Sequence, residues 1–198
     1  MTATYFAWSV LVHDEQAQIS YASLDHIGNY DKAYRLYKGD PLRGELPPDA
    51  FFPMDPAHPK EIRLADNVAN LHNSLVVSDR LKAFMEAQEP PDVEYLPITI
   101  RDHKGRAVED GYHLINPLRV VDAIDQEASE IVWNRINKNR ISVCKRLVLN
   151  YDAIDEHLLL FRLRHRPDAV LVRGDLVEQL TTEGFTGLLF VPVQELKL

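Results

Sequence analysis

The sequence has one cysteine and no long apolar run, and both features restrict the class of protein. Cys144 cannot form an internal disulfide, which suits a protein of a reducing compartment. No run approaches the roughly 18 apolar residues of a membrane-spanning helix. The first residues lack a basic stretch, and their apolar run breaks at residues 13–15, which indicates a strand and not a signal peptide. We therefore expect a cytoplasmic protein that does not bind membranes.

Motifs that carry chemistry are also missing. No Walker A, GxGxxG, GxSxG or HExxH pattern occurs. The eight histidines never recur at the i, i+4 spacing of a helical metal site, and a structural zinc site would recruit more than one cysteine. Cys144 lies in the alternating segment ISVCKRL, which predicts a buried strand cysteine and not a nucleophile. The sequence thus predicts no catalytic residue, no metal and no cofactor.

Acidic residues outnumber basic ones by 30 to 22, so the formal net charge is -8. Such a surface repels nucleic acid and attracts a basic protein. One block departs from this balance, because residues 131–149 hold five basic residues and no acid. Residues 134–149, which carry all five basic side chains, include no aromatic residue that could stack on bases, so we interpret residues 135–140 as the solvated end of a hairpin and not as a nucleic-acid site.

The length of 198 residues and a hydrophobic content of 45% predict a single domain with a sizeable core. We expect an α+β fold with a mixed, mainly antiparallel sheet and a few short helices. Within residues 1–33 we expect two N-terminal strands, Tyr5–Val12 and Tyr21–Ile27, that pair with each other. Residues 41–60 contain six of the 12 prolines and predict a long ordered loop. Loops of this length often face a partner.

Two segments share the same predicted order of elements: a strand, a helix with an N-terminal cap, a residue that ends the helix, and a second strand. They are residues 75–98 and residues 170–193. In the first, Ser78 is a suitable N-cap, and Pro97 in the returning strand indicates a sheet edge or a bulge. In the second, Gly184 follows the helix. The shared plan predicts two similar strand–helix–strand units that pack on one core, whether or not they arose by duplication.

The stretch YHLINPLRVVDAID, residues 112–125, combines a strand pattern with a helix start. Asn116 is a good N-cap and Pro117 suits the first helical position. Val120, Val121 and Ile124 would then share one helix face. We expect this junction at the centre of the fold. Tyr30, Tyr34 and Tyr37 have helical spacing too, and we interpret them as a helix that packs on the core.

The acidic residues after this stretch are the candidate partner-binding site. They are Asp122, Asp125, Glu127 and Glu130. An alternative is catalysis, with Asp122 and Asp125 acting beside His113. Two aspartates at i, i+3 on an exposed helix face are usually just solvated, and a lone histidine more often has a structural role.

Six blocks follow one another in a defined order: SLVVSDRLKAF, VEYLPITI, YHLINPLRVVDAID, KRLVLNYDAIDEHLLLFRL, VLVRGDLVEQL and GFTGLLF. Together, over roughly residues 34–191, they resemble the eleventh immunity-protein family of bacterial polymorphic toxin systems. The resemblance implies an inhibitor that binds a cognate toxin in the producing cell, and it carries over no catalytic residue. A basic toxin, such as a nuclease, would suit the acidic charge.

Three hypotheses follow from the sequence. The first is an immunity protein that binds a toxin encoded next to it. The second is an enzyme, which requires His113 and the two aspartates to meet in a concave pocket. The third is a structural protein that self-associates through a strand edge, which a monomer at high concentration would count against.

Overall fold

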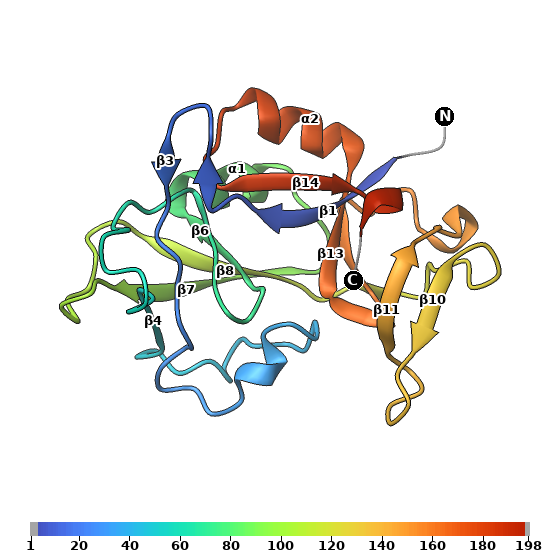
Figure 1. Ribbon diagram of the computed structural model, residues 1–198, viewed down its shortest axis with the longest axis horizontal. Coiled ribbons are helices and arrows are strands. Elements are labelled where there is room, and N and C mark those ends of the chain that lie inside the picture. The colour runs from blue at the N-terminus through green and yellow to red at the C-terminus, as the bar shows by residue number, and fades with distance from the viewer. Residues whose placement is uncertain (1–3, 197–198) are drawn as a thin grey trace.

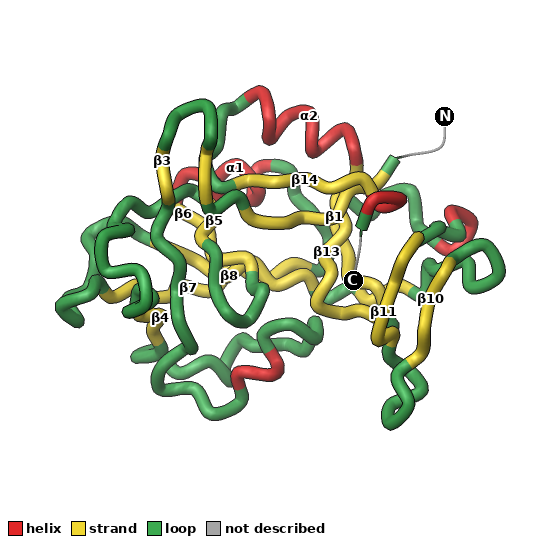
Figure 2. Tube along the Cα trace, in the orientation of Figure 1, coloured by secondary structure: helices red, strands yellow, loops and turns green. Residues whose placement is uncertain are grey.

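Two five-stranded sheets form most of the fold (Figures 1 and 2). The computed structural model describes residues 4–196. The first sheet has the order β4-β7-β8-β6-β5, with bounds Phe51–Pro53, Val93–Arg101, Tyr112–Pro117, Leu75–Ser78 and Asn67–Val68. The second has the order β14-β1-β13-β12-β9, with bounds Leu188–Pro192, Tyr5–Val10, Arg166–Arg173, Leu160–Leu163 and Val120–Val121.

Smaller elements complete the described chain. Two hairpins pair β2 with β3 and β10 with β11, with bounds His13–Asp14, Ile19–Ser20, Glu130–Trp133 and Ile141–Arg146. The helices are α1 and α2, Asp79–Ala87 and Gly174–Thr182, and three 3-10 turns cover Ala33–Arg35, Tyr151–Ala153 and Val193–Glu195. Only β4–β7 and β9–β12 pair in parallel among the described strands. The predicted α+β class with mainly antiparallel sheets is confirmed.

The two predicted strand–helix–strand units are β6-α1-β7 and β13-α2-β14. In each, the two strands flank a third strand that runs antiparallel to both: β8 in the first sheet and β1 in the second. The buried faces of both helices share one core cluster with strands of both sheets. Its members include Leu81, Met85, Leu176, Leu180, Val77, Ile115, Val170 and Val172. The prediction of two similar units on one core is confirmed.

Local chemistry explains how the first unit forms. The hydroxyl of Ser78 accepts the N–H of Leu81 at 3.3 Å, so the predicted N-cap is present. After α1 the chain reverses at Glu89, whose φ is +49°, just before two prolines that cannot continue a helix. The chain then enters β7, the longest strand of the first sheet.

Pro97 lies in β7 at a position where no neighbouring strand needs a hydrogen bond from its backbone nitrogen. The carbonyl of Ile100 accepts a bond from the β8 side, and that of Arg101 accepts one from Met54 on the β4 side. Alternate residues direct their backbone groups to opposite edges, so Pro97 faces the β4 side. There β4 pairs only with Thr99 and the two residues that follow it. The predicted sheet edge is confirmed, and the pairing of β7 with β8 continues past Pro97 without a bulge.

The predicted helix after residue 115 is wrong. Asn116 and Pro117 are the last residues of β8, and Val120–Val121 forms β9, which pairs with β12. Asn116 does not cap a helix because its amide is already engaged: Nδ2 donates to the carbonyl of Asp40 and to Glu94 Oε2, both at 2.9 Å. The chain therefore remains extended across the junction between the two sheets.

Two N-terminal predictions are wrong as well. Tyr21–Ile27 forms no strand with β1, which pairs with β13 and β14 instead. Tyr30, Tyr34 and Tyr37 do not form the predicted helix: only Tyr34 lies in a 3-10 turn, Ala33–Arg35, where it is 50% exposed, while Tyr30 is buried. The local residue pattern could not predict the partners of β1, because its backbone hydrogen-bonds to strands that are distant in the sequence.

Apart from β4, the proline-rich loop consists of turns and irregular backbone. Phe52 and Met54 are buried in the core of the first sheet, and the loop contributes β4 as an edge strand. An edge position agrees with the scarcity of backbone donors in a proline-rich segment.

A buried polar chain connects the two sheets to this loop. Its members are Arg162, Asn116 and Glu94, which are 1%, 2% and 7% exposed. Arg162 donates to the carbonyls of Pro117 at 3.1 Å and of Pro167 at 2.7 Å. It also donates to the carbonyl of Leu36 and to Asn116 Oδ1, both at 3.4 Å. Burial lowers the pKa of the guanidinium to about 10, so it remains charged at neutral pH.

Glu94 continues this chain into the proline-rich loop. Its carboxyl oxygens accept the backbone N–H groups of Leu42 at 2.9 Å and Arg43 at 3.1 Å. Buried polar groups must be paired, and here one guanidinium, one amide and one carboxyl group satisfy one another and the nearby backbone. The network thus fixes the start of the loop against β7 and β8.

Replacing Arg162 with Met should lower the free energy of unfolding by about 3 kcal/mol, because it leaves several buried carbonyls without a donor. Arg164→Met is the matched control. Its side chain is 60% exposed and lies 3.8 Å from Asp122, so its loss should cost less than about 1 kcal/mol. Urea unfolding measures both values, and equal losses would contradict a structural role for the Arg162 network.

Gly39 and Gly44 provide a second matched pair, because both have left-handed backbones, with φ of +76° and +80°. A Cβ at Gly39 would lie 3.1 Å from the Cδ of Arg162, whereas one at Gly44 would meet nothing within 4 Å. Gly44→Ala should cost about 1 kcal/mol for backbone conformation alone. Gly39→Ala should cost about 1 kcal/mol more, since it also crowds the buried arginine. Urea unfolding of both variants checks this, and identical stabilities would refute it.

Candidate partner-binding surfaces

The predicted acidic site covers the loop between β9 and β10 and the first residue of β10, Glu130, and its residues do not share a helix. Asp122 contacts His165 at 3.3 Å and Arg164 at 3.8 Å. Asp125 accepts the backbone N–H groups of Glu127 and Ala128, which closes a turn. The four acidic residues therefore lie along one segment, but Asp122 and Asp125 already contact other groups of the protein.

Two members of this segment remain available to a partner. Glu130 is exposed and forms a 3.3 Å ion pair with Arg146, and both side chains are more than half exposed. Glu127 is exposed, and within residues 4–196 no cation lies at ion-pair distance from it. An exposed pair such as Glu130–Arg146 contributes little to stability and can be rearranged by a partner.

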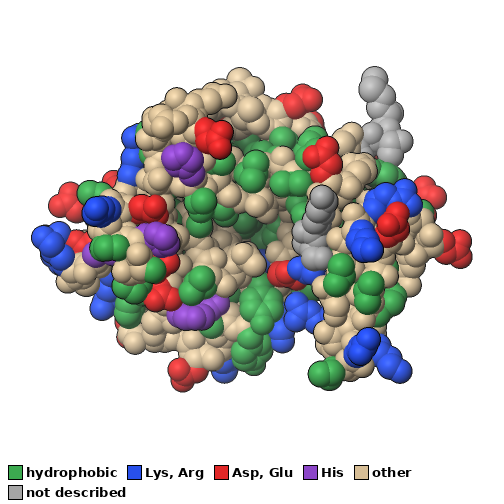
Figure 3. All heavy atoms as spheres, in the orientation of Figure 1, with side chains coloured by type: hydrophobic (Ala, Val, Ile, Leu, Met, Phe, Trp, Pro, Cys, Tyr) green, Lys and Arg blue, Asp and Glu red, His purple; other side chains and the backbone are tan. Residues whose placement is uncertain are grey.

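The hairpin of β10 and β11 stands beside this loop and was predicted correctly. Its inner face includes Cys144, which is buried as predicted, and burial raises the pKa of the thiol. On its outer face Val132 pairs with Val143, and the two are 54% and 42% exposed. Ile136 at its tip is 97% exposed. Hydrophobic and basic side chains lie together over this region on the face drawn in Figure 3.

The set proposed for catalysis is not brought together. His113 lies on β8 in the first sheet, where its Nδ1 is 3.1 Å from Asp79 Oδ1. Asp122 contacts His165 and belongs to the loop after β9 in the second sheet. The expectation that His113, Asp122 and Asp125 share a pocket is therefore wrong, because His113 lies on β8 of the first sheet while Asp122 follows β9 of the second.

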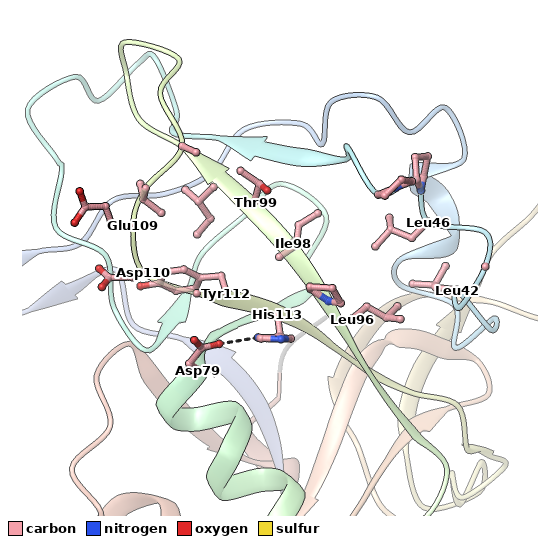
Figure 4. A pocket seen from close by; sticks show the side chains of 18 residues that line it. Leu42, Leu46, Asp79, Leu96, Ile98, Thr99, Glu109, Asp110, Tyr112 and His113 are labelled. Carbon is pink, nitrogen blue, oxygen red and sulfur yellow. Dashed lines mark ion pairs between the residues drawn. The ribbon is translucent and has the colours of Figure 1, made fainter.

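A groove of about 590 Å³ lies between the proline-rich loop and the β7–β8 hairpin (Figure 4). Leu42, Leu46 and the prolines at 47 and 48 line one side, and Leu96 and Ile98 of β7 line the middle. The far side carries three carboxylates: Asp79, Glu109 and Asp110. None of the 18 lining residues is a lysine or an arginine.

Close backbone contact builds the acidic end of this groove. The N–H of Asp79, the first residue of α1, donates to the carbonyl of Gly111 at 3.0 Å. A Cβ at Gly111 would collide with the Asp79 carboxyl group. Burial lowers the pKa of His113, although Asp79 raises it, so the histidine is neutral at pH 7 and leaves the negative charge of the groove uncompensated.

A neighbouring hollow of similar size, about 610 Å³, is lined by charges of both signs and shares Asp110 with the groove. It is lined by Arg63, Lys104 and Arg106 together with Asp102 and Asp110. Arg106 hydrogen-bonds Asp102 and holds its pKa at about 2. The acidic lining of the groove is therefore a local property, and not only a consequence of the overall net charge.

The described residues give two further results. None of the helices in residues 4–196 is long and apolar enough to cross a membrane. Within the same residues, no three histidine, cysteine, aspartate or glutamate side chains come together as a metal site.

The described residues form an α+β protein whose surface carries an acidic segment and a groove with acidic and apolar sides. A family model identifies the class of protein: the chain belongs to the immunity protein family Imm11, whose model matches residues 28–195. This confirms the resemblance and extends it a few residues beyond both ends of the expected range. No curated protein matches the chain.

The contact between Asp79 and His113 predicts a titration. Because burial depresses the pKa of His113 in the folded state, its contribution to stability is complete above the unfolded value near 6.5 and is lost as the pH falls. Asp79→Asn removes a carboxylate that raises this pKa, so the pKa of His113 should fall further. NMR titration of the imidazole measures it. Glu178→Gln on α2 is the control, and an unchanged or raised pKa in Asp79→Asn would contradict the assignment.

Proposed function

We propose that this protein binds a toxin made by the same bacterium and neutralises it in the cytoplasm, by occupying its surface and not by chemistry. Membership of an immunity protein family is the observation that carries this proposal. The setting is a polymorphic toxin system used in competition between bacteria. The toxin is encoded beside the immunity gene, so that toxin and inhibitor are made together.

The net charge of -8 favours a basic toxin. Opposite charges steer two proteins together and raise the association rate, most strongly at low salt. Nucleases that act on phosphate backbones are frequently basic, so a nuclease is the toxin class that fits best.

We place the toxin contact on the acidic segment of Asp122, Asp125, Glu127 and Glu130, together with the proline-rich loop. Glu127 and Glu130 are its most accessible members. Asp125 has a structural part as well, because it closes the turn that positions them.

The experiment for the function is coexpression with the protein of the neighbouring reading frame. Cells that make the toxin alone should stop growing, and cells that also make this protein should survive and yield a complex of the two. Neither protection nor a complex with any adjacent candidate toxin would contradict the proposal.

Charge reversal tests the contact. Glu127→Lys with Glu130→Lys should slow association with an inactivated toxin about 10-fold at low salt, because it removes steering charge without breaking the Asp125 turn. Stopped-flow mixing measures the rate. Glu178→Lys with Glu183→Lys makes the same charge change on α2 and should have a much smaller effect. Equal rates for the wild type and the first variant would remove this segment from the interface.

A further inference from the structure

We infer that the groove between the proline-rich loop and the β7–β8 hairpin receives an extended segment of the toxin in which apolar residues alternate with lysine or arginine. This inference rests on the proposed function and assigns it a second contact. The groove lies toward the β7–β8 turn, whereas the acidic segment lies at the base of the β10–β11 hairpin, near the other end of the molecule in Figure 1.

The charges of the groove select a basic occupant. Glu109 and Asp110 are exposed, and within the described residues neither forms an ion pair with a lysine or an arginine. The third carboxylate, Asp79, lies 3.1 Å from His113, and within the described residues it forms no ion pair with a lysine or an arginine. Three carboxylates with no cation in the lining produce a negative potential inside a concave surface, which concentrates its effect on a positively charged ligand.

The side opposite these carboxylates selects apolar side chains. Leu46 is only partly buried, and the prolines beside it present a rigid apolar wall. Leu96 and Ile98 lie between this wall and the acidic end. A segment that alternates basic and apolar residues would thus place one kind of side chain on each wall.

The backbone of β7 provides the third element. Successive residues of β7 direct their backbone groups to opposite edges of the strand. Tyr95 and Pro97 therefore direct theirs to the edge on the β4 side, at a level where β4 is not paired with β7. Residues 96–100 line the groove, so this free strand edge lies within it. An added strand can pair with such an edge, and the carbonyls of Tyr95 and Pro97 would accept its N–H groups.

The loop wall is fixed before any partner arrives. Glu94 holds the N–H groups of Leu42 and Arg43, and Asn116 holds Glu94. A preformed groove loses little conformational entropy when it binds an extended segment. The buried network therefore connects the core of the protein to its second contact surface.

The test uses Glu109→Lys with Asp110→Lys in the full chain, against the inactivated toxin of the neighbouring reading frame. Both side chains are exposed, so the variant should unfold at the same urea concentration as the wild type. Its association with the toxin should be about 10-fold slower at low salt. The variant Glu178→Lys with Glu183→Lys is the charge-matched control and should associate at nearly the wild-type rate. Hydrogen exchange at residues 95–99 should slow in the complex.

A second measurement keeps the inference separate from the proposed function. A synthetic peptide of alternating lysine and valine should bind the wild type, and the Glu109/Asp110 variant should bind it about 10-fold more weakly. A peptide of alternating glutamate and valine should not bind.

The two experiments test the groove inference and the proposed function separately. If the toxin binds and the Glu109/Asp110 variant associates at the wild-type rate, the groove inference is wrong and the proposed function stands. If no toxin binds but the lysine peptide prefers the wild type, the basic preference of the groove stands and the proposed function fails. Equal binding of the two peptides, or equal binding of the lysine peptide to both proteins, overturns the groove inference.

Discussion

The buried contact of Arg162 with Asn116, and of Asn116 with Glu94, is the interaction on which the rest of the structure depends. Arg162 belongs to the second sheet, Asn116 and Glu94 to the first, and Glu94 holds the backbone of the proline-rich loop. Burying a charge is costly unless it is fully hydrogen-bonded, and each of these groups finds its partners only when both sheets and the loop are in place. The network therefore specifies one relative arrangement of the three parts.

This arrangement gives the protein two kinds of surface. A binding protein needs a shape that exists before its partner arrives, because each segment ordered on binding reduces affinity. The loop is fastened to β7 by Leu42 and Arg43, and an acidic, apolar groove results. The acidic segment that leads into β10 is held by the turn at Asp125. Membership of an immunity protein family is the reason why we propose both surfaces as contacts for a toxin.

The sequence predicted the fold class, β6, α1 and the β10–β11 hairpin, because local patterns and caps such as Ser78 determine these elements. The sequence wrongly predicted a helix at Asn116. This residue is suited to capping a helix, but its side-chain amide donates instead to Glu94, which is distant in the sequence. The sequence could not locate the groove either, since Leu46 and Glu109 line its opposite sides only after Glu94 has fixed the loop and β7 has paired with β8. The acidic segment could be predicted because its residues are close in the sequence. The contacts of Asp122 with Arg164 and His165 could not, because those residues belong to a distant part of the chain.

The central claim is that the buried network holds the proline-rich loop in place in the free protein. Hydrogen exchange of the amides of Leu42 and Arg43, which donate to Glu94, tests it most directly. In the free protein these two amides should exchange as slowly as core amides of β8, because only global unfolding releases them. Exchange at the rate of an exposed loop would show that the loop opens independently, and the account would be wrong.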